Sequence, residues 1–218
     1  MAVPGTLSLL LSVLTGLFYF VVLPRPASHL RAILKTLPVL LLAGHAWFTH
    51  SQGLLVTALA LSALGDAFLA YKGERAFMAG LVSFLLAHIA YGALFISLSD
   101  IPGISAEIWR VIAAVISIAF VILFVASLRA PAGKLAPAVL VYGLAILAMA
   151  LLSIAVPSAA VFIGAALFMS SDAVLAVQTF IMGPAHRWSG IASYYVWGSY
   201  FAAQCILATT LGGGPTGL

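Results

Sequence analysis

The sequence predicts an all-α protein, a polytopic membrane bundle of eight transmembrane helices. Of its 218 residues, 64% are hydrophobic and only 6% are charged, whereas a soluble domain carries roughly 25% charged residues. The apolar residues form runs of about 20, the length that an α-helix needs to cross roughly 30 Å of hydrocarbon. Proline, glycine or charged residues separate nearly all of these runs, as is typical of loops between spans.

Eight apolar runs are expected to form a single transmembrane domain over residues 1–218. In chain order they are residues 6–23, 30–48, 54–71, 76–98, 107–126, 135–155, 158–182 and 189–211. The breaks between them lie at residues 24–26, 51–53, 72–75, 100–103, 131–134, at Pro157 and at residues 183–187. The first run has no basic residue before it and is followed by Arg25, the reverse of a cleavable signal peptide, so we expect it to remain as the first span.

The distribution of Lys and Arg indicates how the bundle is oriented. Eight of the nine basic residues fall at odd-numbered connections or their flanks: Arg25, Arg31, Lys35, Lys72, Arg75, Arg129, Lys134 and Arg187. Only Arg110 falls on the other side. Because basic residues favour the cytoplasmic side, we expect an integral protein of the bacterial inner membrane, surrounded by membrane lipids, with both termini outside the cytoplasm.

The composition also argues against a nucleic-acid partner and a disulfide framework. The formal net charge of +4 comes from few, dispersed basic residues, whereas a surface that binds phosphate backbones needs clustered Lys and Arg. The single cysteine, Cys205, cannot form an internal disulfide and is expected to pack within an apolar helix.

Two aspartates in matching contexts are the main functional signal. Gly65-Asp66-Ala-Phe-Leu-Ala70 reappears almost unchanged as Ser171-Asp172-Ala-Val-Leu-Ala176. The aspartates are 106 positions, or four spans, apart, so spans three and seven cross in the same direction and the two halves form parallel four-helix repeats. Burying one charge in hydrocarbon costs at least a few kcal/mol, so two such carboxylates indicate a site.

Further polar residues fall near these aspartates in predicted depth. Ser62 lies one helical turn before Asp66, on the same face, and His88 lies near the middle of span four. Other candidates are Lys35 in span two, Tyr91 in span four, Ser171 in span seven, and Tyr194, Tyr195 and Gln204 in span eight. We expect Lys35 to pair with one carboxylate and tyrosine hydroxyls to satisfy the other.

Each of these residues also has a purely structural interpretation. The aspartates could instead hold neighbouring helices together through hydrogen bonds, and His88 could form a structural hydrogen bond across helices. Lys35 could extend its side chain to the membrane–water interface. A catalytic zinc takes three protein ligands, which one histidine and two carboxylates could supply. The paired His spacing of such sites is missing, however, so no metal or other cofactor is expected.

Together these residues resemble the YhhN-like lysoplasmalogenase family over nearly the whole chain. The resemblance lies in Gly65-Asp66 with Leu69, Phe77, Gly80, Phe84, His88 and Tyr91, and in Ser171-Asp172-Ala-x-Leu175-Ala176 with Tyr194-Tyr195 and Gln204. Lys35 and Pro38 are similar to the family's Lys-Pro-Leu in the second span, with Thr36-Leu37 between them.

The resemblance implies an eight-span hydrolase that cleaves the vinyl ether of lysoplasmalogens into a fatty aldehyde and glycerophosphoethanolamine or glycerophosphocholine. Such a reaction needs one protonated acid and one carboxylate, roles that Asp66 and Asp172 can divide. His88 would orient one of them or bind the polar head, and Lys35 would receive the lysophospholipid's phosphate.

Two other functional classes remain open on the sequence alone. A proton-coupled transporter of a small or amphiphilic substrate also uses intramembrane carboxylates in repeated halves. Such a protein usually has a helix-breaking glycine or proline beside each carboxylate. Gly65 adjoins Asp66, but the neighbours of Asp172 are neither glycine nor proline. A structural or assembly protein is the third possibility, and two buried aspartates count against it.

Overall fold

A backbone in hydrocarbon must satisfy all of its hydrogen bonds internally, so an apolar chain of this kind folds into helices. The computed structural model describes residues 2–99, 107–183 and 185–212. Within them it contains eight α-helices and no strand. The predicted break at residues 100–103 and Pro184 in the last break lie outside the described residues.

One α-helix overlaps each predicted run, although the helix ends differ from the predicted ones by up to a few residues. The helices are α1 (Ala2–Val22), α2 (His29–Phe48), α3 (Gly53–Leu69), α4 (Glu74–Leu98), α5 (Ile108–Leu128), α6 (Ala136–Ile154), α7 (Ala159–Val177) and α8 (Ser189–Leu211). A short 3₁₀ turn, η2 (Gly133–Leu135), precedes α6, and one π-helical segment, η3 (Gln178–Met182), continues α7.

The prediction of a polytopic helical membrane bundle is confirmed, but the count of eight spans stays a prediction. Among the described residues, six helices are long and apolar enough to cross a membrane: α1, α2, α4, α5, α6 with η2, and α7 with η3. Helix α3 has 17 residues, about 26 Å at 1.5 Å per residue. Helix α8 has 23 residues but carries more polar side chains.

The described chain divides into two compact units. The first comprises the residues up to Leu94 together with those from Gln204 onward, and the second runs from Phe95 to Ala203. The expectation of a single domain with two parallel repeats therefore stays a prediction.

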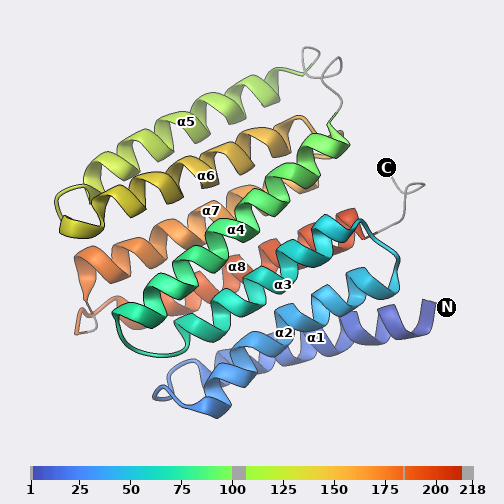
Figure 1. Ribbon diagram of the computed structural model, residues 1–218, viewed down its shortest axis with the longest axis horizontal. Helices are drawn as coiled ribbons and strands as arrows, with labels where there is room; N and C mark the ends of the chain where they lie inside the picture. Colours follow the sequence, from blue (N-terminus) through green and yellow to red (C-terminus); the bar gives the residue numbers. More distant parts are fainter. Residues whose placement is uncertain (1, 100–106, 184, 213–218) are drawn as a thin grey trace. The chain divides into compact units, whose positions relative to one another are not determined.

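In the first unit, α1, α2 and α3 run side by side (Figure 1). Ser8 and Ser12 of α1 donate hydrogen bonds of 2.7 Å to the carbonyls of Leu41 and Pro38 in α2. Pro38 lies inside α2, where its ring removes one backbone hydrogen bond. The serines thus join α1 to α2 where the α2 backbone is weakened.

Close contacts at glycine join α3 to α4 within the first unit. A Cβ on Gly65 would lie 2.6 Å from the ring of Phe84, and one on Gly80 would lie 2.7 Å from the side chain of Leu69. Only glycine leaves room for this approach. The hydroxyl of Ser83 adds a 2.8 Å hydrogen bond to the carbonyl of Leu61.

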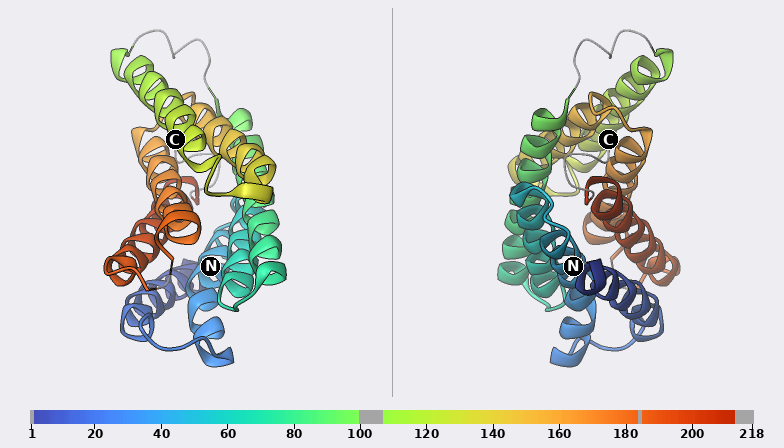
Figure 2. Two further views of the ribbon diagram at one scale, coloured as in Figure 1. Left: turned by 90° about the vertical axis from the view of Figure 1, so that its left-hand side faces the viewer. Right: turned by 90° about the vertical axis from the view of Figure 1, so that its right-hand side faces the viewer.

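In the second unit, α5 and α6 lie side by side in Figure 1 and in both views of Figure 2. A Cβ on Gly143 would lie 2.6 Å from Val125, so glycine again permits the close approach. Helix α7 packs on α6, and the buried side chains that hold the three helices together are Val121, Ile146, Ala150 and Met169.

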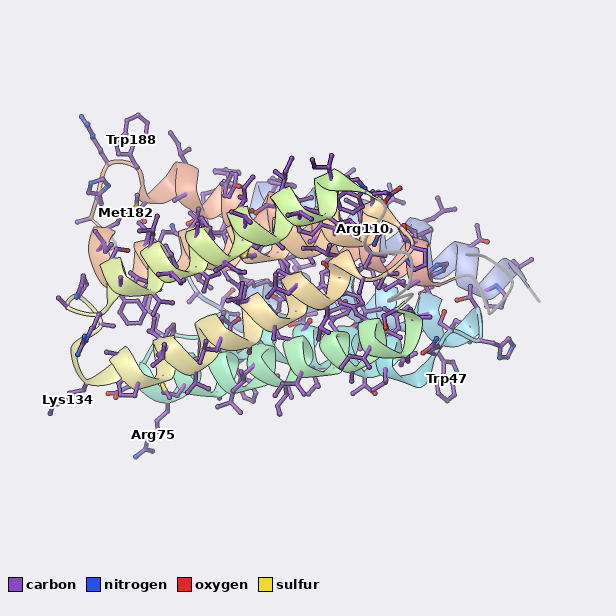
Figure 3. All side chains as sticks on the ribbon, turned by 90° about the horizontal axis from the view of Figure 1, so that it is seen from above. Trp47, Arg75, Arg110, Lys134, Met182 and Trp188 are labelled. Carbon is purple, nitrogen blue, oxygen red and sulfur yellow. The ribbon has the colours of Figure 1, made fainter. Side chains whose placement is uncertain are left out.

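The labelled residues of Figure 3 mark the two ends of each unit. In the second unit Lys134, Met182 and Trp188 lie at one end and Arg110 at the other (Figure 3). In the first unit Arg75 and Trp47 lie at opposite ends (Figure 3). The predicted membrane orientation stays a prediction.

Candidate active site

The first unit places a buried ion pair at Asp66. The Nζ of Lys35 on α2 lies 3.2 Å from Oδ1 of Asp66 on α3, and the two side chains are 19% and 2% exposed. The ion pair expected from the sequence therefore forms. Lys35 neutralises the negative charge that makes Asp66 costly to bury in an apolar helix.

A group of buried polar side chains lies on the same unit. Ser62, His88, Tyr91 and Gln204 are 0% or 1% exposed. The hydroxyl of Tyr91 donates to Oε1 of Gln204 over 2.6 Å, which joins α4 to the end of α8. Nδ1 of His88 donates to the carbonyl of Phe84 over 2.6 Å, so this ring nitrogen bonds within α4 and not across helices.

The second unit gives Asp172 a different partner. The hydroxyl of Tyr142 on α6 donates to Oδ2 of Asp172 on α7 over 2.7 Å, and Asp172 is buried. Ser171 donates to the carbonyl of Val196 on α8 over 2.9 Å, so it fixes α7 against α8.

Tyr194 and Tyr195 occupy more exposed positions than the aspartates. They are 41% and 47% exposed. The hydroxyl of Tyr195 donates to Ser170 over 3.1 Å, and Ser170 precedes the predicted Ser171. Tyr142, which was not among the predicted site residues, bonds to Asp172.

The two aspartates have partners at similar, though not identical, distances along the chain. Lys35 precedes Asp66 by 31 positions and comes from the preceding helix. Tyr142 precedes Asp172 by 30 positions and also comes from the preceding helix. One carboxylate thus has a cationic partner and the other a neutral hydroxyl, which makes their chemical environments different.

Tyr142 and Arg110 are the residues that the sequence reasoning missed. A tyrosine inside an apolar run carries no signal of its own, and the 31-residue offset between Lys35 and Asp66 leads to Val141, one position before Tyr142. Arg110 is buried, and its guanidinium donates to the carbonyls of Ile154 and Val156 at the end of α6.

The described residues contain no group of three or more His, Cys, Asp or Glu side chains that could hold a metal ion. Asp66 and Asp172 belong to different units, so their action as a catalytic pair stays a prediction. What each unit holds is one buried carboxylate with a fixed hydrogen-bonding or ionic partner.

Comparison with known proteins places these features in a family. A sequence model of the YhhN family matches residues 30–211. Over 184 residues the chain is 33% identical to lysoplasmalogenase TMEM86B of Homo sapiens, and the match covers 83% of this chain and 74% of the relative. No solved structure matches the chain significantly.

Proposed function

The chain belongs to the YhhN family, and on that basis we propose that it is a membrane-embedded hydrolase that cleaves the vinyl ether of lysoplasmalogens. The products would be a fatty aldehyde and glycerophosphoethanolamine or glycerophosphocholine. The observation that carries the proposal is the 33% identity to a relative named lysoplasmalogenase. The buried carboxylates on α3 and α7 supply the chemistry that such a reaction requires.

Vinyl ether hydrolysis needs an acid and a base but no cofactor. A proton is added to the vinyl carbon distant from oxygen, which leaves an oxocarbenium ion. Water attacks the carbon next to oxygen and loses a proton, and the resulting hemiacetal breaks down to the aldehyde and the free glycerol hydroxyl. Positioned carboxyl groups typically contribute 10²–10⁴-fold to such proton transfers.

We assign the two proton transfers to Asp66 and Asp172. Their different partners, the ammonium of Lys35 and the hydroxyl of Tyr142, support a division of labour between one ionised and one protonated carboxyl. Ser171 fixes the helix that carries Asp172, and the exposed faces of Tyr194 and Tyr195 are positioned to contact the lysolipid at the membrane boundary.

The test is hydrolysis of a lysoplasmalogen by purified protein, with the products identified by mass spectrometry. Asp66→Asn and Asp172→Asn should each lower kcat by about 10²–10⁴-fold, while Glu74→Gln, which removes an exposed carboxylate at the start of α4, should keep full activity. Full activity of Asp172→Asn would refute the two-carboxylate mechanism. Release of fatty acid in place of aldehyde would indicate an ester hydrolase.

The same preparation separates hydrolysis from transport. Reconstituted in liposomes with an imposed pH gradient, the protein should release aldehyde without accumulating intact lysolipid. Proton-driven accumulation without aldehyde would favour the transporter. We further propose that the protein lies in the bacterial inner membrane with the ends that carry Arg75 and Lys134 in the cytoplasm, as the distribution of basic residues predicts.

A further inference from the structure

The buried polar side chains of the first unit have hydrogen-bonding capacity beyond the bonds described above. We refer to Ser62 on α3, His88 and Tyr91 on α4, and Gln204 on α8 as the polar cluster. The hydroxyl of Ser62 and Nε2 of Gln204 have no hydrogen-bond partner among the described residues, and both side chains are 0% exposed. A buried polar group without a partner costs about 1–3 kcal/mol, so two such groups point to a polar guest.

The packing of α3 on α4 brings the members of the cluster to one level. Gly65 lies against Phe84, and Leu69 lies against Gly80. The two helices are therefore antiparallel, and a step of four residues forward along α3 matches a step of four residues back along α4. One step further places Leu61, next to Ser62, opposite His88. Tyr91 follows His88 by three residues and shares its helix face, and Gln204 is bonded to Tyr91.

The hydrogen bonds that do form determine what the remaining atoms offer. A carbonyl oxygen only accepts, so His88 Nδ1 carries the proton that it donates to Phe84. Oε1 of Gln204 accepts from Tyr91, so its NH₂ group is the donor that remains. The Ser62 hydroxyl is able both to donate and to accept.

We propose that Ser62 and Gln204 bind the water molecule that hydrolysis consumes; this rests on the proposed function. A buried water makes 2–4 hydrogen bonds to otherwise unsatisfied polar groups, and the Ser62 hydroxyl and the Gln204 NH₂ group supply two neutral partners. A phosphate group would instead need a cation, and Lys35 is already paired with Asp66.

The location of the cluster identifies Asp66 as the base. Ser62 and Asp66 are four residues apart on α3, a spacing that places their Cβ atoms about 5–6 Å apart on one face. As the water oxygen bonds to the oxocarbenium carbon, its proton passes to the Asp66 carboxylate, whose charge Lys35 balances.

Ser83 provides a matched control for Ser62. It is also a buried serine facing the α3–α4 contact, but its hydroxyl is bonded to the carbonyl of Leu61. Ser62→Ala should lower kcat about 10–100-fold with KM unchanged, since only a bond to water is lost. Ser83→Ala should keep kcat and lower the thermal unfolding midpoint. Gln204→Met, of similar length, should lower kcat as Ser62→Ala does.

A second measurement detects the water without relying on activity. In X-ray hydroxyl-radical footprinting, buried side chains are oxidised where bound water lies beside them. Tyr91 should be oxidised in the detergent-solubilised protein although it is 0% exposed, and Ser62→Ala should reduce this labelling. Phe168, equally buried in the second unit, is the control that should stay unlabelled.

The outcomes separate this inference from the proposed function. Equal labelling of Tyr91 and Phe168, or unchanged kcat in Ser62→Ala and Gln204→Met, would overturn the water site even if both aspartate variants are inactive. A raised KM with unchanged kcat would also overturn it and assign the cluster to the lipid head group. Labelled Tyr91 in a protein that releases no aldehyde would show a bound water without a hydrolytic role.

Discussion

Removing Lys35 tests whether Asp66 depends on its ion pair. Lys35→Met keeps most of the side-chain volume but leaves the Asp66 carboxylate, 2% exposed, without its ammonium partner. At 3.2 Å and an effective dielectric constant of about 20, the two charges attract by roughly 5 kcal/mol. Breaking a buried pair from one side typically costs about 3–5 kcal/mol. Because Lys35 keeps some solvent contact, we expect about 3 kcal/mol.

The assay is the free energy of unfolding, measured by titration with a denaturing detergent in mixed micelles. Lys35→Met/Asp66→Asn removes both charges, and since replacing a whole buried pair is often nearly neutral, this double variant should lie within about 1 kcal/mol of the wild type. Lys35→Arg should be intermediate. Equal stability of Lys35→Met and the wild type, or a double variant as unstable as the sum of the single ones, would refute the reasoning.

Three further predictions concern other contacts. Gly65→Ala should lower the free energy of unfolding by about 1–3 kcal/mol because its Cβ would overlap the Phe84 ring, whereas Gly190→Ala, which meets nothing within 4 Å, should not lower it. Tyr142→Phe should cost about 0.5–1.5 kcal/mol, as for a hydrogen bond between neutral groups, and lower kcat without raising KM; an unchanged kcat would leave the tyrosine with a structural role alone. Hydrogen bonds from the side chains of Arg110 and Trp109, above all from Arg110, hold the pKa of Glu107 below its ordinary value of 4.5. Its contribution to stability is therefore present above pH 4.5 and lost as the pH falls through the lower folded value, so the wild type and Glu107→Gln should converge in acid.

Hydrophobicity and loop chemistry were enough to locate the helices. A backbone surrounded by lipid must form its hydrogen bonds internally, and a helix does so. The lengths of the apolar runs therefore suffice to predict where the helices lie. The same reasoning could not decide whether α3 and α8 span the membrane. Helix α3 is short, and α8 interrupts its apolar surface with Tyr194, Tyr195 and Gln204.

The candidate site was only partly accessible from the sequence. The free-energy cost of burying a charge in an apolar helix singled out Asp66, and it predicted the Lys35 partner because a buried charge requires an opposite one. It could not choose among the tyrosines for Asp172, since several lie at plausible depths, and only the side-chain geometry reveals the bond from Tyr142. The unsatisfied atoms of Ser62 and Gln204 depend on side-chain geometry, which no spacing rule supplies.

In the proposed orientation Arg110 is the one basic residue on the side opposite the other eight, and its contacts compensate its charge. Its guanidinium lies 3.0 Å from Glu107 and also bonds to the carbonyls that end α6. These contacts let the folded chain hold the guanidinium buried, with its charge balanced by Glu107 and its N–H groups bonded.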